Sequence, residues 1–264
     1  MFEQIRPPAV AGFFYPAEQT ELENMLQGFL QVSVDSDLQI PPKAIIVPHA
    51  GYIYSGSVAA SAYVRLQPVQ EKIRRVVLLG PSHHVPFRGL ATSSATYFAT
   101  PLGEVKLDTD STEKVLQLPQ VGMLDAAHEQ EHSLEVHLPF LQMLLDDFVL
   151  LPLVVGDANA AAVAQVLEQV WGGEETLIVI SSDLSHFHDY QTAQQLDAQT
   201  SKAITSLEQT PLRGEQACGC KPVNGLLKVA RDKHLSVDVV DLRNSGDTAG
   251  SKDRVVGYGA YVFH

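Results

Sequence analysis

The segment Ala44-Ile45-Ile46-Val47 runs directly into Pro48-His49-Ala50-Gly51, so a short apolar stretch ends at a histidine in a turn. The pattern recurs at Val76–Leu79, followed by Gly80-Pro81-Ser82-His83-His84, and at Leu177–Ile180, followed by Ser181-Ser182-Asp183-Leu184-Ser185-His186. Continuous apolar runs of this length are typical of strands in a helix-covered sheet. In open parallel α/β sheets, ligands bind beyond the carboxyl ends of the strands. The three runs therefore predict one pocket that receives several histidines.

The rest of the chain alternates between helical and strand patterns. Helices are predicted at 57–66, 110–118, 133–145, 159–170, 191–207 and 223–234, and further strands at 148–155, 236–242 and 255–263. Pro152 predicts an edge position or a bulge for its strand. Residues 89–105, with a turn at 100–103, predict a hairpin inserted over the pocket. We expect a single α/β domain over residues 1–264, with a mostly parallel or mixed central sheet flanked by helices.

The composition narrows the classes of function. The 264 residues include 18 basic and 31 acidic side chains, which give a formal net charge of −13. Such a field repels nucleic acid and anionic lipid, so neither is an expected partner. No apolar run approaches the ~20 residues of a membrane span, and no signal peptide is visible at the N-terminus. With only Cys218 and Cys220, one residue apart, a reducing cytoplasm is the expected location.

His49 and His83 are the first candidate metal ligands, because each follows a predicted buried strand. A buried histidine pair costs desolvation unless a neighbour uses it. Since adjacent side chains do not both point inward easily, we expect one of His83 and His84 to bind and the other to support it. Asp183 and His186, after the third strand, add a carboxylate and an imidazole to the same pocket, and binding of metal or orientation of a histidine are both open for Asp183. His132, Glu135 and His137 form a second polar cluster, for which buttressing by hydrogen bonds and direct ligation are both open.

The segment His128-Glu129-Gln130-Glu131-His132 matches the H-E-x-x-H pattern of zinc peptidases. That pattern requires both histidines on one continuous helix, with Glu129 as the base. Ser133, however, has the character of an N-cap for the following helix, which would leave His128 in a loop. A zinc peptidase is therefore the less favoured alternative.

Cys218 and Lys221 lie where a helix is expected to begin. A thiolate at a helix N-terminus beside a lysine is stabilised, which favours a ligand or redox role for Cys218. The Cys-x-Cys pair alone does not make a zinc site, because the chain has no second pair of thiols.

In combination these motifs resemble the Memo family. The resemblance covers nearly the whole chain and rests on motifs at residues 11–16, 48–52, 79–84, 131–139, 181–186 and 218–222. Bacterial and archaeal members are named protein B of the AmmeMemoRadiSam system, beside radical-SAM and AMMECR-type partner proteins. The family is similar in fold to class III extradiol dioxygenases of the LigB type, which hold Fe(II) with two histidines and a glutamate.

The resemblance implies roles for individual residues. His49 and His83 match the two histidine ligand positions, and His186 matches the acid/base position. Cys218 stands where Memo proteins have a cysteine and the dioxygenases rely on a glutamate. A thiolate is softer than a carboxylate, so copper or zinc is an alternative to iron. Tyr52 belongs to the first motif and is expected beside the pocket.

These observations predict a metal-binding protein of the oxidoreductase class, similar to dioxygenases, with an unidentified small-molecule substrate. Fe(II) is the expected metal, held by His49, His83 and Cys218, with Asp183 and His186 as catalytic groups. The alternative is a non-catalytic adaptor that binds a peptide or small anion in the same pocket.

Overall fold

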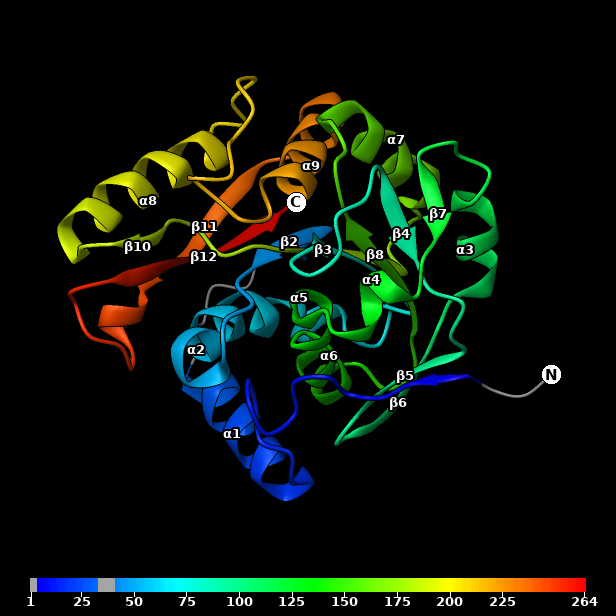
Figure 1. Ribbon diagram of the computed structural model, residues 1–264, viewed down its shortest axis with the longest axis horizontal. Coiled ribbons are helices and arrows are strands. Elements are labelled where there is room, and N and C mark those ends of the chain that lie inside the picture. Colours follow the sequence, from blue (N-terminus) through cyan, green and yellow to red (C-terminus); the bar gives the residue numbers. More distant parts are fainter. Residues whose placement is uncertain (1–3, 33–40) are drawn as a thin grey trace.

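Four parallel strands form the centre of the protein. The computed structural model describes residues 4–32 and 41–264 (Figure 1). The central strands lie side by side in the order β2 (Ala44–Val47), β9 (Thr176–Ser181), β3 (Arg75–Pro81) and β8 (Val149–Val155). Nearly all of their residues are buried, as their apolar sequences predict. Because the strands are parallel, their carboxyl ends meet at one edge.

Further strands extend this sheet on both sides and make it mixed. β12 (Val255–Phe263) pairs antiparallel with β2, with β10 (His186–His188) and with β11 (Val237–Asn244). On the opposite side, β4 (Leu90–Thr92) pairs antiparallel with β8 and parallel with β7 (Val121–Met123). The predicted α/β class with a mixed central sheet is therefore confirmed.

Helices cover both faces of the sheet, because the strands alternate their side chains between two apolar clusters. Figure 1 shows the two layers on opposite sides of the sheet. One layer consists of α1 (Gln19–Val32), α2 (Tyr52–Tyr63), the short helix η1 (Val64–Val69), α5 (His132–Glu135) and α6 (Leu138–Leu144). The other consists of α3 (Thr109–Val115), α7 (Ala160–Val170), α8 (Tyr190–Thr205) and α9 (Cys220–Asp232). Helix α1 was not among the predicted helices.

The predicted hairpin exists, but it does not lie over the pocket. β5 (Tyr97–Thr100) and β6 (Gly103–Lys106) pair across the expected turn, and β5 also pairs with β1 (Ile5–Arg6). These strands form a separate small sheet, and none of their residues lines the cleft described below. The hairpin packs elsewhere because β1 supplies a third strand for it.

The predicted helix at 133–145 is two helices. α5 ends at Glu135 and α6 begins at Leu138, with Pro139 in its first turn. Proline is accepted in a first turn but cannot continue a preceding helix, which explains the break. Ser133 is not an N-cap, because the Glu131 side chain caps α5 by accepting from the backbone N–H of Ser133.

Pro152 lies within β8, which has neighbours on both sides rather than an edge position. β3 pairs with β8 along its whole length, whereas β4 reaches only Val154 and Val155. Pro152 therefore lacks a strand partner on the β4 side, so its missing N–H costs little. Within the described ranges, no helix is long and apolar enough to cross a bilayer.

Candidate metal centre

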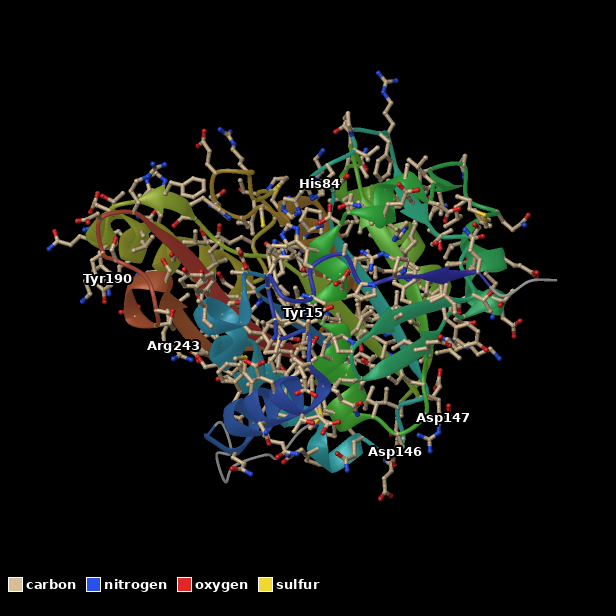
Figure 2. The ribbon with its side chains drawn as sticks, turned by 60° about the horizontal axis from the view of Figure 1, so that its bottom comes forward. Tyr15, His84, Asp146, Asp147, Tyr190 and Arg243 are labelled. Carbon is tan, nitrogen blue, oxygen red and sulfur yellow. The ribbon has the colours of Figure 1, made fainter. Side chains whose placement is uncertain are left out.

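Three histidines converge at the carboxyl edge of the sheet. His49 follows β2, His83 follows β3, and His132 opens α5, which packs against β3. One ring nitrogen from each lies within 4.8 Å of the other two. Figure 2 shows the adjacent His84 at the opposite end of the molecule from Asp146 and Asp147, which precede β8. The cluster thus occupies the edge that the strand pattern predicts.

Ser181 orients His49. Its hydroxyl donates to the carbonyl of Ser133 at 2.6 Å and lies 2.6 Å from Nδ1 of His49. Since that hydroxyl proton is already used, Ser181 accepts from Nδ1–H, and the lone pair of His49 is on Nε2. The backbone N–H of His49 donates to Oδ1 of Asp183 at 2.7 Å. The two contacts together fix the position of the buried His49 imidazole.

Glu131 orients His83 in the same way. Its Oε1 lies 2.8 Å from Nδ1 of His83, and its Oε2 accepts the backbone N–H of His83 at 2.7 Å. Although burial opposes ionisation, the hydrogen bonds from the ring and backbone of His83 lower the pKa of Glu131 to about 2. The carboxylate therefore accepts from Nδ1–H, which leaves Nε2 of His83 for a ligand. Metal-binding histidines are typically oriented by such a carboxylate.

His132 completes the cluster. Its ring stacks on that of His83, with centroids 4.5 Å apart, and lies 5.4 Å from the ring of His49. Burial, and then the neighbouring imidazoles, lower the pKa of His49 well below its usual range and that of His132 as well. Both rings are therefore neutral near pH 7, which is the form that binds metal.

This donor set fits a transition-metal ion. Two metal–nitrogen bonds of 2.0–2.1 Å bring ligand atoms of one ion within about 4 Å of each other, and the three histidine nitrogens lie within 4.8 Å of one another. Neutral imidazoles suit zinc, copper, iron and nickel. The ionised Glu131 beside them supplies a compensating negative charge.

The centre opens into a cleft of about 530 Å³. Asp183 and His186 line this cleft with the three histidines, so the predicted pocket groups are brought together. Nδ1 of His186 lies 2.9 Å from the carbonyl of Leu184, which assigns the proton to Nδ1 and leaves Nε2 as a proton acceptor. Burial raises the pKa of Asp183. Arg254 is the one cationic side chain among the described residues that line the cleft.

Cys218 contacts the centre without joining the group of three ligand atoms. Its Sγ lies 3.3 Å from Nε2 of His49 and 3.7 Å from the carbonyl of Asp183, and it lines a second cavity of about 270 Å³. The expected stabilisation of a thiolate is not found, because desolvation and then the charge of Asp183 raise the pKa of Cys218. Cys220 is buried in the first turn of α9.

The other predicted pocket residues surround the centre at different depths. His84 is exposed, with its ring 6.3 Å from that of His132. Tyr52 is buried and donates to the carbonyl of Val136 at 2.6 Å. His137 is buried in the core, and neither of its ring nitrogens has a hydrogen-bond partner among the described residues. Glu135 is buried at the end of α5, three residues after His132.

The H-E-x-x-H segment lacks the geometry of a zinc peptidase. α4 (Ala126–Glu129) ends before α5 begins, so His128 and His132 are not on one helix. His128 is buried, its Nε2 lies 3.0 Å from the carbonyl of Ala91, and burial lowers its pKa to about 4. Glu129 is exposed. Of this segment, only Glu131 and His132 belong to the centre.

Two orienting residues, Glu131 and Ser181, were not assigned from the sequence. Glu131 stands directly before His132 in a polar segment, and a carboxylate at a helix start is a capping signal. That signal identifies the cap but not the contact with His83, which comes from a distant strand. Ser181 is the last residue of β9, a position that faces the edge.

The protein is therefore an α/β protein with a candidate metal site, formed by three histidines at the carboxyl edge of its mixed sheet. A family model described as "Memo-like protein" matches residues 6–262, and the chain belongs to this family. A "MEMO1 family protein" of Aquifex aeolicus is 38% identical over 98% of this chain and 99% of its own length. One from Ignicoccus hospitalis is 35% identical over 98% of each chain.

The fold is also found among solved structures. An uncharacterized protein from Escherichia coli K12 matches with a TM-score of 0.54 and 13% sequence identity. The match covers 81% of this chain and 98% of that one. At this identity the likeness concerns the fold alone.

Proposed function

We propose that this protein binds a single transition-metal ion through His49, His83 and His132, and that it is an oxidoreductase similar to dioxygenases. The convergence of three histidine nitrogens at the mouth of a cleft carries this proposal. Ser181 and Glu131 each fix one imidazole with a lone pair on Nε2, an arrangement that serves metal binding. The fold positions all of these groups at one edge of the sheet.

Fe(II) is the metal we propose first, since the family resembles non-haem iron dioxygenases, with copper or zinc as alternatives that imidazole also accepts. When bound, Fe(II) supplies one-electron and oxygen chemistry. The chain's own residues supply the rest. The cleft admits a small substrate, and Nε2 of His186 accepts a proton from it. The Asp183 carboxylate holds His49 in place by accepting from the backbone N–H of His49.

The adaptor alternative is supported by one observation. Arg254 lines the cleft, and its guanidinium carbon lies 5.1 Å from the ring centre of the exposed Phe187. A small anion or a peptide carboxylate could bind there without any metal. Loss of such binding in Arg254→Gln, with no change when the metal is removed, would favour the adaptor.

Metal affinity measured on single variants tests the centre. After anaerobic purification, Fe(II) and Zn(II) affinities should fall in His49→Ala, His83→Ala and His132→Ala by more than the roughly 10–100-fold that loss of an orienting partner costs. His234→Asn is the matched control, because His234 is exposed and its backbone φ of 56° suits asparagine. Unchanged affinity in all three variants would remove the metal from the proposal.

The same assay distinguishes the third ligand. If Cys218 rather than His132 binds the metal, then Cys218→Ser will weaken binding as much as His49→Ala, and His132→Ala will not. His186→Ala should retain the metal but lose oxygen consumption with a catechol. Equal loss of metal in His186→Ala and His49→Ala would contradict the proton-transfer role.

A further inference from the structure

The buried carboxylate of Glu135, three residues after His132, takes all of its hydrogen bonds within the described part of the chain from residues that precede the first helix. Its Oε1 accepts from the backbone N–H of Val10 at 2.9 Å and from the hydroxyl of Tyr15 at 2.6 Å. Its Oε2 accepts from Arg6 at 2.6 Å and from the backbone N–H of Ala9 at 2.7 Å. The side chain is fully buried. All four donors lie in residues 5–16, which we call the N-terminal strap.

Arg6 extends this network to the segment that carries the metal ligands. Besides its ion pair with Glu135, it donates from Nε to the carbonyl of His128 at 2.7 Å and from Nη2 to the carbonyl of Glu131 at 2.9 Å. The carbonyl of Glu131 belongs to the peptide that joins it to His132. One buried guanidinium therefore holds both ends of the turn between α4 and α5.

The strap also forms a wall of the cleft. The ring of Phe14 lies 4.6 Å from that of His132, and Phe14 lines the cleft. The carbonyl of Phe14 accepts the backbone N–H of Tyr52 at 2.7 Å, which ties the strap to the turn after His49. Figure 2 shows Tyr15 in the middle of the molecule, beside the blue N-terminal segment. The strap thus contacts segments that carry two of the three histidines.

We propose that Glu135 is a positioning residue, which docks the N-terminal strap and thereby holds Glu131 and His132 in place for the metal. A buried ion pair contributes little net stability by itself, but removing one partner leaves the other charge uncompensated. Here the contacts of Arg6 end on the two carbonyls that frame the ligand turn. Strap docking and metal binding must then be linked, and each strengthens the other by the same factor. This inference rests on the proposed metal centre.

The test measures Zn(II) affinity and strap protection together. In Glu135→Gln, an amide NH₂ replaces one acceptor oxygen and faces existing donors, so Zn(II) affinity should fall roughly 10–100-fold. In wild type, Zn(II) should slow hydrogen exchange of the backbone amides at 9–14, and this protection should be lost in the variant. Zn(II) affinity is measured by competition with a chromophoric chelator.

Asp108→Asn is the matched control. Asp108 is buried, forms an ion pair at 2.7 Å with the half-buried Arg75 at the other end of β3, and caps α3, a role that asparagine also performs. It should change Zn(II) affinity by less than roughly twofold, since distant sites act independently. A comparable loss of affinity in Asp108→Asn would show a general effect of stability and overturn the positioning role.

The outcomes separate the two proposals. If wild type binds Zn(II) no better than His83→Ala, the metal centre itself is wrong and the coupling falls with it. If wild type binds and folded Glu135→Gln binds equally well, only the coupling is overturned. Should Glu135→Gln fail to fold, Tyr15→Phe removes a single hydrogen bond from the same carboxylate. It should weaken Zn(II) binding roughly three- to tenfold, and unchanged affinity would again overturn the coupling.

Discussion

Glu131 performs several tasks with one side chain. Its oxygens accept from the backbone and ring of His83 and from the backbone of Ser133, so it caps α5 and orients a ligand together. Glutamine cannot accept at both positions. We therefore expect Glu131→Gln to weaken Zn(II) binding about 10–100-fold, measured by chelator competition.

Glu129→Gln provides the comparison, because Glu129 is exposed and lies outside the centre. A loss of affinity in Glu131→Gln no greater than in Glu129→Gln would show that Glu131 does not orient His83.

His137 gives a prediction about pH. Burial lowers the pKa of His137 well below its usual value near 6.5, so the folded state stays neutral while the unfolded state gains a proton as the pH falls. Stability should therefore decrease below about pH 6.5. In metal-free protein at pH 5.5, this histidine should cost about 1.4 kcal/mol relative to pH 7.5. Urea unfolding of wild type and His137→Leu measures it. If both lose the same free energy of unfolding between these pH values, the assignment is wrong.

For single residues, the location of the proposed metal ligands could be predicted from the sequence better than the identity of all three. His49, His83, Asp183 and His186 follow strands whose apolar patterns are local and clear, so their shared edge could be predicted. His132 enters through the packing of α5 against β3, a contact between distant segments that no local spacing reports. The contacts of Ser181 and Glu131 with the histidines depend on that same packing.

Gly219 gives a prediction at the scale of a helix. It caps the start of α9, and a Cβ there would lie 2.5 Å from the carbonyl oxygen of Ser181 and 2.6 Å from Cβ of Ser182. Gly219→Ala must push α9 away from β9, which should lower the free energy of unfolding by about 1–3 kcal/mol.

Gly214→Ala is the control, because nothing lies within 4 Å of a Cβ at that position. Chemical denaturation of both variants tests the contact, and equal stabilities would contradict it.

The elements themselves were predicted unevenly. The strand β8 and the helices α7 and α8 lie close to their predicted ranges. The two helices are long enough for their pattern of apolar and polar residues to repeat several times, and β8 is a nearly continuous apolar run, which makes the predictions reliable. The break between α5 and α6 follows from Pro139, a local signal that the predicted range 133–145 passed over. The pairing of β5 with β1 could not be predicted, because the partner strand lies far away in the sequence.

At the scale of the whole molecule, β12 joins the central strand β2 to the outer strands β10 and β11. Tyr261, Val262 and Phe263 pair with Ile46, Ile45 and Ala44, so the strand that leads to His49 is paired with one near the other end of the chain. β12 also pairs with β10, which carries His186. Without β12, both elements lose a neighbour, and the apolar β2 becomes an open sheet edge.

This topology has a consequence for biosynthesis. During translation β2 leaves the ribosome well before its antiparallel neighbour β12, because all elements from α2 to β11 lie between them in the sequence. The nascent polypeptide therefore carries an unpaired apolar strand until β12 is made, and the proposed metal centre can be complete only after that. A chain stopped after Gly250 should aggregate on expression and retain no Zn(II), as measured by sedimentation and metal analysis of any soluble fraction. A soluble, zinc-binding product of that length would mean that the site assembles before translation is complete.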